Sequence, residues 1–205
     1  MLGDKGFDLW ADGYDKAVGL SDEEQSYPFA GYKNVLGKIY QLVMAKGKAK
    51  VLDIGFGTGT LTTRLYAQGC EIWGQDFSSR MIELASAKMP KAHLFQADFS
   101  QGLSAPILQN TYDFILATYS LHHLTDGDKI HLIQTLRGLL NADGAILIGD
   151  VAFSDRQALE RCRESAGEEW DDEEIYFVFD ELRKSFPTMQ FEQISHCAGV
   201  LSLLR

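Results

Sequence analysis

The chain has 205 residues, of which 45% are hydrophobic, and its formal net charge at pH 7 is −10. This length and apolar content suit one globular domain with a buried core and argue against two domains. Because surfaces that bind nucleic acid depend on clustered Lys and Arg, the acidic balance argues against DNA or RNA as a substrate and favours a small or neutral molecule.

Targeting and redox signals point to one compartment. The start of the chain shows no h-region of a signal peptide, and no apolar run approaches the roughly 18 residues that a membrane helix needs. The cysteines Cys70, Cys162 and Cys197 are far apart and odd in number, which is typical of a reducing environment. We therefore expect a cytoplasmic protein with no membrane partner; the oligomeric state does not follow from the sequence.

The first half of the chain alternates between helical and strand-like apolar periodicity, which predicts a parallel sheet covered by helices. A helix opens at Pro28 and ends at the Lys46-Gly47-Lys48 stop. Strands over residues 50–54, 71–75 and 93–97 then alternate with helices over residues 60–68 and 79–89. A loop over residues 100–110, with at most a short helix, precedes a fourth strand over residues 112–118.

The second half contains further helix and strand signals. Thr125 and Asp128 predict the start of a helix that runs to Leu140. A turn over residues 141–144 leads to a fifth strand over residues 145–148 that ends near Asp150. Ser154 and Gln157 form a second capping box, which opens a helix to about Ala166.

An acidic cluster, residues 171–174, could suggest a cation site. With Arg183-Lys184 at the far end, its charges instead favour a solvated helix that stops at Pro187. Residues 189–196 and 200–204 predict an antiparallel hairpin at one sheet edge. The fold class is therefore α/β: a Rossmann-like three-layer sandwich with a seven-stranded, mostly parallel sheet.

Alternate glycines, Gly55, Gly57 and Gly59, directly follow the first strand and precede a helix. Glycine at such a turn lets the backbone approach a ligand closely, although an ordinary strand-to-helix turn gives the same pattern. Asp76 at the end of the second strand would lie beside this turn and could bind both hydroxyls of a ribose. The alternative is that Asp76 caps the following helix.

The sixth position of the dinucleotide fingerprint, which calls for Gly or Ala, is Thr60 here. Asp53 stands in the strand end before the glycines. This combination favours a nucleoside ligand without a pyrophosphate. We include Asp53 and Thr118, both at strand ends, in the predicted cofactor site.

At these motifs the chain resembles the class I S-adenosylmethionine-dependent methyltransferases, in particular small bacterial members. The matching pieces, in chain order, are Trp10 to Asp15, Asp53 to Gly59, Gly74 to Ser78 with Met81, Gln96 to Phe99, and Tyr119 to Leu124. The resemblance implies that Gly55, Gly57 and Gly59 lie under the methionine part of S-adenosylmethionine and that Asp76 holds the ribose. It also implies that Phe77 packs on the adenine, that Asp98 accepts from its amino group beside Phe99, and that Tyr14 closes over the methionine end.

The segment after the fourth strand would face the transferred methyl group, because ligands of open α/β sheets lie outside the carboxyl ends of the strands. We predict His122 and Tyr119 as catalytic residues, with His123 as a further candidate. The alternative is that the histidines satisfy local backbone groups and the tyrosine only lines the cavity. Asp126, Asp128 and Asp150 could approach one another, but their spacing does not require it, so we predict no metal.

We therefore predict a single domain over residues 1–205 that methylates a small-molecule acceptor. Residues 1–48 form an N-terminal helical lid, residues 49–150 the cofactor-binding core, and residues 151–205 the substrate-side helices and last strands. The first 30 or so residues and the segment around 154–172 would form the lid. Two alternatives stay open: an NAD-type oxidoreductase, and a protein that binds S-adenosylmethionine without catalysis.

Overall fold

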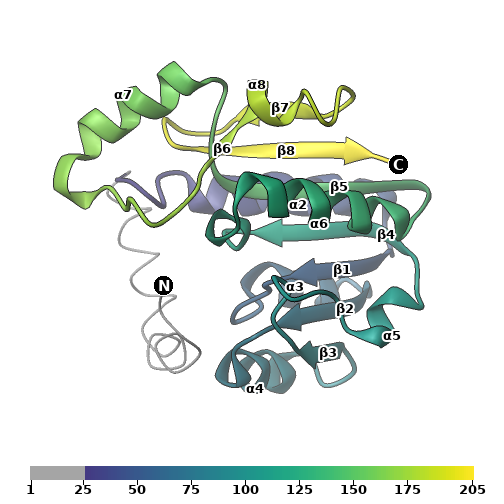
Figure 1. Cartoon of the computed structure of the whole chain (residues 1–205). Helices are drawn as coiled ribbons and strands as arrows, with labels where there is room; N and C mark the ends of the chain where they lie inside the picture. Colours follow the sequence, from purple (N-terminus) through teal and green to yellow (C-terminus); the bar gives the residue numbers. More distant parts are fainter. Residues whose placement is uncertain (1–25) are drawn as a thin grey trace.

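A computed structural model describes residues 26–205. Tyr14, predicted to contact the cofactor, and the first part of the predicted lid lie outside the described residues. Within residues 26–205 the strands form one sheet in the order β3-β2-β1-β4-β5-β8-β7, and β6 pairs with the end of β5 (Figure 1). The bounds are β1 Lys50–Ile54, β2 Glu71–Asp76, β3 His93–Gln96, β4 Tyr112–Thr118, β5 Leu140–Phe153, β6 Phe177–Val178, β7 Gln190–Gln193 and β8 Ala198–Leu204.

Strands β1 to β5 run parallel, and β8 runs antiparallel to both β5 and β7. The predicted α/β class, the mostly parallel sheet and the antiparallel C-terminal pair are confirmed. The extra strand beyond the predicted seven is β6, which has two residues and pairs only with the end of β5.

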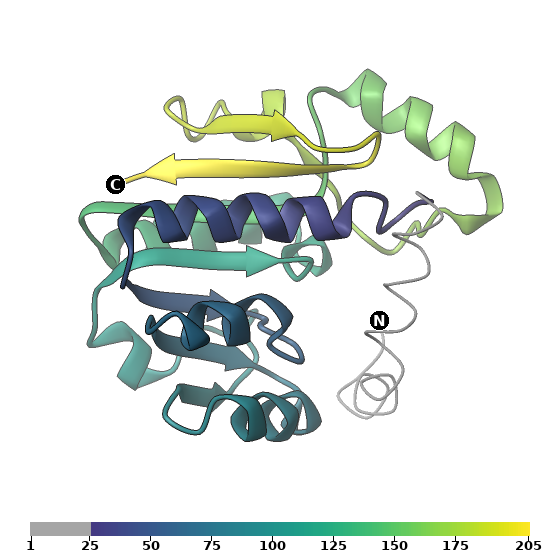
Figure 2. The ribbon, with the colours of Figure 1, turned by 180° about the vertical axis from the view of Figure 1, so that it is seen from behind.

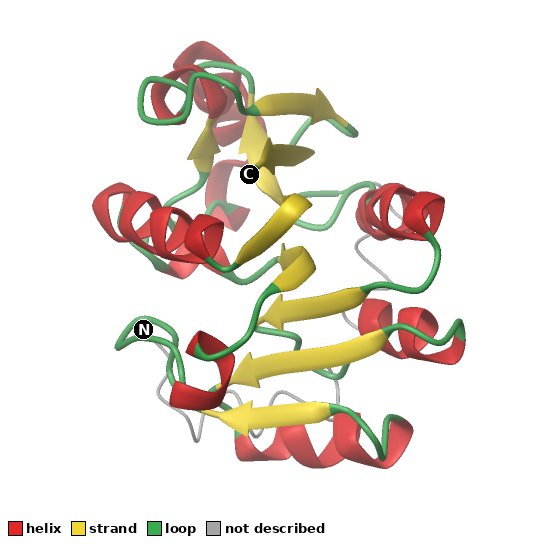
Figure 3. Cartoon of the chain, turned by 90° about the vertical axis from the view of Figure 1, so that its right-hand side faces the viewer, coloured by secondary structure: helices red, strands yellow, loops and turns green. Residues whose placement is uncertain are grey.

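Helices cover both faces of the sheet (Figure 3). On one face lie α2 (Tyr32–Lys46), α3 (Thr60–Ala67) and α4 (Ser79–Lys88); on the other lie α5 (Ala105–Leu108), α6 (Asp126–Gly138) and α8 (Phe179–Leu182). Helix α2 runs along β5 and β8 (Figure 2). The remaining helical segments are α7 (Arg156–Ala166) and the 3₁₀ turns η1 (Leu121–His123) and η2 (Gly167–Glu169).

The two cores follow from strand geometry, since successive side chains point to opposite faces. In β4, Phe114 and Leu116 belong to the core under α2, whereas Ile115 and Ala117 belong to the core under α6. Among the described residues, no helix combines the length and the apolar character that crossing a lipid bilayer requires.

Helix starts differ from the prediction at two places. Helix α2 begins at Tyr32 rather than at Pro28, because Gly31 has a left-handed backbone with φ of 79° that cannot continue a helix. Helix α7 is capped by Asp155 rather than by Ser154. The Asp155 Oδ1 accepts from the Ala158 N–H at 2.8 Å, and Ser154 donates to the other carboxylate oxygen.

Two further predictions were wrong. Residues 141–144 are not a turn outside the sheet but part of β5, whose pairing with β4 shifts register between Tyr112 and Phe114. The predicted helix over residues 171–186 does not form. Those residues instead run through an extended segment into β6 and the single turn of α8.

Candidate functional site

A cavity open to solvent lies at the carboxyl ends of β1, β2 and β4. This is the edge at which open α/β sheets bind ligands. Most predicted cofactor residues line it: Asp53, Gly55, Gly57, Asp76, Phe77, Phe99 and Thr118, together with Tyr119. Other lining residues, which the sequence reasoning did not assign to the site, include Tyr32, Phe56, Thr58, Leu61, Ser78, Met81 and Ser120.

Each of the three glycines has its own reason to lack a side chain. A Cβ on Gly57 would meet no atom within 4 Å, so the backbone at this position borders open space on the cavity wall. A Cβ on Gly55 would lie 2.5 Å from that of Ser120. Gly59 does not line the cavity, and a Cβ there would press on Met89, the residue that follows α4, at 3.1 Å. All three have positive φ, which the turn requires.

The acid at the end of β2 is joined directly to the glycine turn. Asp76 is buried, its Oδ2 accepts from the Gly57 N–H at 2.9 Å, and its Oδ1 accepts from the Ser78 N–H at 2.9 Å. The cap of α4 is Ser78, whose hydroxyl accepts from the Met81 N–H. Ser78, and not Asp76, therefore caps α4, and Asp76 lines the cavity.

Asp53 is a buried carboxyl on the same wall. It is 1% exposed, and its Oδ1 has no hydrogen-bond partner among the described residues. Burial, followed by the charge of Asp76, raises the pKa of Asp53 to about 8. At neutral pH this carboxyl is therefore mostly protonated.

Two predicted cofactor residues lie apart from this wall. Asp98 is exposed and does not line the cavity; its Oδ1 accepts from the Ser100 N–H at 2.8 Å in a local turn. Phe99 beside it does line the cavity. The predicted contacts of Asp98 and Gly59 with a cofactor thus remain predictions.

Tyr119 lies at the end of β4 with a φ of 50°, a conformation that non-glycine residues rarely adopt and that recurs at functional sites. Its ring packs at 5.0 Å from that of Tyr32 and 5.4 Å from that of Phe29. Tyr32, the first residue of α2, and Tyr119 therefore form one aromatic part of the cavity wall, with Phe29 packed against both rings.

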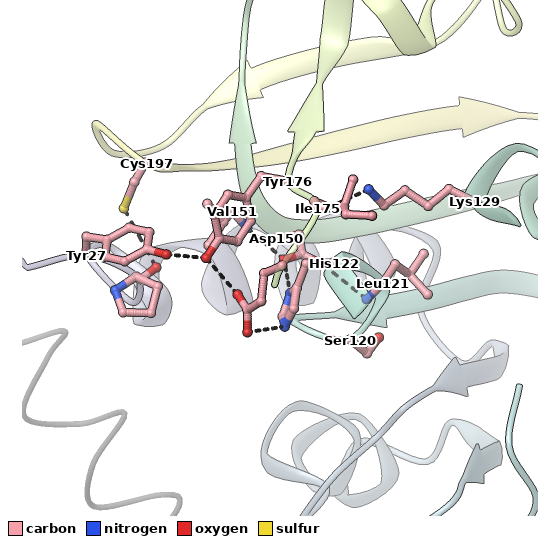
Figure 4. A network of polar contacts seen from close by, with 12 residues as sticks. Tyr27, Ser120, Leu121, His122, Lys129, Asp150, Val151, Ile175, Tyr176 and Cys197 are labelled. Carbon is pink, nitrogen blue, oxygen red and sulfur yellow. Dashed lines mark hydrogen bonds and ion pairs between the residues drawn. The ribbon is translucent and has the colours of Figure 1, made fainter. Parts of the chain in front are cut away.

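The two adjacent histidines on η1 have different surroundings. His123 lines the cavity, whereas His122 does not. His122 is buried, and its Nδ1 lies 2.6 Å from Oδ1 of the fully buried Asp150 (Figure 4). Of the two residues predicted as catalytic, Tyr119 lines the cavity and His122 does not. His123 occupies the position on the cavity wall that was expected for His122.

The two imidazole rings also differ in pKa. Burial lowers the pKa of His122, but the charge and hydrogen bond of Asp150 and the charge of Glu174 outweigh it, so the pKa is raised. Burial and the charge of His122 lower the pKa of His123 to about 4. His123 thus presents a neutral imidazole at neutral pH.

The acids considered for a metal do not converge. Asp126 pairs with Lys129, the Asp128 carboxylate accepts from the Thr125 hydroxyl, and Asp150 holds His122. In the described residues, the cluster whose ligand atoms do approach one another is His122, His123 and Glu174, all within 4.8 Å. Sequence reasoning missed it because Glu174 was expected on a solvated helix.

Comparison with known proteins identifies the relatives of this chain. Residues 51–144 match the family model described as a methyltransferase domain. An uncharacterized methyltransferase of Geobacillus sp. (strain WCH70) is 37% identical over 188 residues, which cover 88% of this chain and 85% of the relative. One of Halobacillus halophilus is 32% identical over 193 residues, or 91% and 87% of the two chains.

Solved structures share the fold. The complex of DhpI with SAH has a TM-score of 0.71 at 15% identity, covering 98% of this chain and 94% of that one. Magnesium protoporphyrin IX methyltransferase (ChlM) from Synechocystis PCC 6803 with bound SAH has a TM-score of 0.67 at 18% identity, covering 86% and 84%.

Proposed function

Because the chain belongs to the class I methyltransferases that use S-adenosylmethionine, we propose that it transfers a methyl group from this cofactor to a small-molecule acceptor. One observation carries the assignment of the cofactor site: the Gly57 N–H and the Asp76 carboxylate are hydrogen-bonded on the same cavity wall. A turn that presents backbone and an adjacent carboxylate together suits a ribose and the chain attached to it.

The residues of the wall fit this cofactor. Gly57 leaves room where any side chain would project into the cavity, and the buried Asp53 Oδ1 lacks a hydrogen-bond donor among the described residues. We infer that Asp53 receives the methionine ammonium group and that Asp76 receives the ribose hydroxyls, with Phe77 and Phe99 near the adenine. When bound, S-adenosylmethionine supplies a methyl group already activated by its sulfonium charge.

The protein then has to hold the acceptor in line and exclude water, which needs few catalytic side chains. Tyr32, Tyr119 and His123 lie on the wall and could position an acceptor. The net charge of −10 supports a small neutral or cationic acceptor over a nucleic acid. The three free, buried cysteines support the expectation of a reducing, cytoplasmic location.

The first experiment is calorimetric titration with S-adenosylhomocysteine and, separately, with NAD. We expect binding of the homocysteine nucleoside only, since Thr60 occupies the position where a dinucleotide site has Gly or Ala. Asp76→Ala should weaken binding by about 1.5 to 3 kcal/mol, which is about 10- to 150-fold. Asp143→Ala removes an exposed acid from β5 and is the matched control.

Because Asp76 also accepts a hydrogen bond from Gly57, Asp76→Asn serves as a second variant that keeps the side-chain shape. Unchanged affinity in folded Asp76→Ala and Asp76→Asn, or tight binding of NAD alone, would refute the assignment. Screening with labelled S-adenosylmethionine against small thiols, amines, phenols and carboxylates then identifies the acceptor. Cofactor binding without any turnover would favour the non-catalytic alternative.

A further inference from the structure

Beside the cofactor cavity, three side chains from two distant segments place possible metal ligands together. His122 and His123 come from the 3₁₀ turn after β4, and Glu174 comes from the extended segment before β6. Their ligand atoms lie within 4.8 Å of one another. The two imidazole rings meet edge to face, with centroids 4.2 Å apart.

His122 is oriented as a metal-binding histidine usually is. Its Nδ1 is bonded to Oδ1 of Asp150, and this aspartate also accepts from the Val151 N–H at 2.8 Å and from the Leu121 N–H at 3.3 Å. The ring is therefore fixed with Nε2 turned toward Glu174, whose Oε1 lies 3.6 Å away. A carboxylate on the far nitrogen of a ligating histidine fixes its tautomer and makes it a stronger ligand.

Glu174 is held in place from both sides. Its Oε2 accepts from the Tyr176 hydroxyl at 2.7 Å, which leaves Oε1 toward His122. The next residue, Ile175, donates its N–H to the His122 carbonyl at 2.8 Å and accepts from the buried Lys129 (Figure 4). The extended segment is thus fastened to η1 by backbone bonds as well as by its side chain.

The surroundings of these ligands are acidic. Asp150 is fully buried, Glu174 is partly buried, and the His122 ring lies between these two carboxyl groups. Two histidines and one glutamate form a ligand set that zinc uses, with a fourth position open to water or substrate. We propose that His122, His123 and Glu174 bind a divalent transition-metal ion, and that zinc is the ion this ligand set favours.

This site adjoins the cofactor cavity, because His123 belongs to both. If the proposed function holds, a metal here would lie at the acceptor end and could bind a thiol or hydroxyl acceptor and favour its deprotonated form. The competing account is metal-free: a protonated His122 that bridges Asp150 and Glu174.

Zinc binding distinguishes the two accounts without any assay of activity. The full chain, freed of any affinity tag and treated with chelator, is titrated with Zn²⁺ by calorimetry and in competition with a chromophoric chelator. Co²⁺ serves as a second probe, because its visible absorption reports the ligand geometry. We expect one ion per chain and a loss of affinity of roughly tenfold or more in His123→Ala and in Glu174→Gln.

The control is His131→Ala, which removes an exposed histidine of α6 and should leave the affinity unchanged. His123→Ala is preferred to His122→Ala, which would leave the buried Asp150 without its partner; thermal melts of the metal-free variants check folding. The proposal is overturned if the wild-type protein binds zinc no more tightly than the His123→Ala and Glu174→Gln variants do. It is also overturned if His131→Ala lowers the zinc affinity as much as those two substitutions. Titration of the metal-free chain with S-adenosylhomocysteine tests the proposed function separately.

Discussion

Asp53 is a buried carboxyl on the cavity wall, and its protonation state affects the stability of the fold. Its pKa is raised to about 8 by burial and by the charge of Asp76, from an ordinary value of 3.8. Between about pH 4 and pH 8 the folded chain therefore holds a proton on Asp53 that the unfolded chain has lost. The contribution of Asp53 to the free energy of unfolding therefore falls as the pH rises through this window, because at this residue the folded state binds more protons than the unfolded state.

Asp53→Asn removes this dependence while keeping the shape of the side chain. We expect the variant to gain stability relative to wild type as the pH is raised from 5 to 8, in the absence of cofactor. Urea unfolding of both proteins at several pH values measures the difference. A difference that stays constant across this range would contradict the pKa of Asp53.

At the level of single residues, the sequence located the cavity better than the catalytic groups. The glycine turn and Asp76 follow from strand-end rules, which act locally. The same local rules do not tell which of two adjacent histidines faces the cavity. Which of His122 and His123 faces the cavity is decided by the buried Asp150 and by Glu174, which come from distant parts of the chain.

Among the elements, β5 and α2 show how closely strand and helix are packed. Gly149 of β5 lies under α2, and a Cβ there would overlap Val35 Cγ1 and lie 2.8 Å from Ile39 Cδ1. Both neighbours are fully buried and cannot move aside cheaply. Gly149 is therefore required by the approach of the helix.

Gly149→Ala should destabilise the protein by about 1 to 3 kcal/mol through overpacking. The matched control is Gly37→Ala in α2, where a Cβ would meet nothing within 4 Å. Replacing glycine by alanine inside a helix stabilises it by up to about 1 kcal/mol, so this variant should be no less stable than wild type. Chemical denaturation of both variants measures the contrast. Equal stability of the two would show that α2 does not press on β5.

The elements that the sequence missed share one cause. Residues 171–186 carry a charge pattern typical of a helix, yet contacts with η1, Lys129 and β5 hold the part that directly precedes α8, residues 174–178, extended. Likewise, residues 141–144 have turn-like composition but lie within β5, as an irregularity between the paired Leu140 and Ala145. In both cases tertiary contacts outweigh local preference, and local preference is what sequence periodicity reports.

Across the whole molecule, the two segments predicted as a lid meet in their described parts. The ring of Tyr27 stacks on Trp170 at 5.1 Å, and the Tyr27 hydroxyl accepts from the Asp171 N–H. These segments join the sheet through residues that also belong to its cores, so we expect one cooperative unit.

Scanning calorimetry tests this expectation. A single transition is predicted, and S-adenosylhomocysteine at about 100 times its dissociation constant should stabilise the whole chain by about 2.7 kcal/mol. NAD at the same concentration should not shift the transition. Two transitions, of which the ligand moves only one, would divide the chain into separate domains.

Strand β5 pairs with β4 on one side, with β8 on the other and with β6 at its end. Its amides are therefore expected to be the slowest in the protein to exchange with deuterium, since exposing them requires the sheet to come apart on both sides. Asp150 thus lies on the strand that is expected to open last, so the residue that orients the His122 ring is carried by the most persistent part of the backbone.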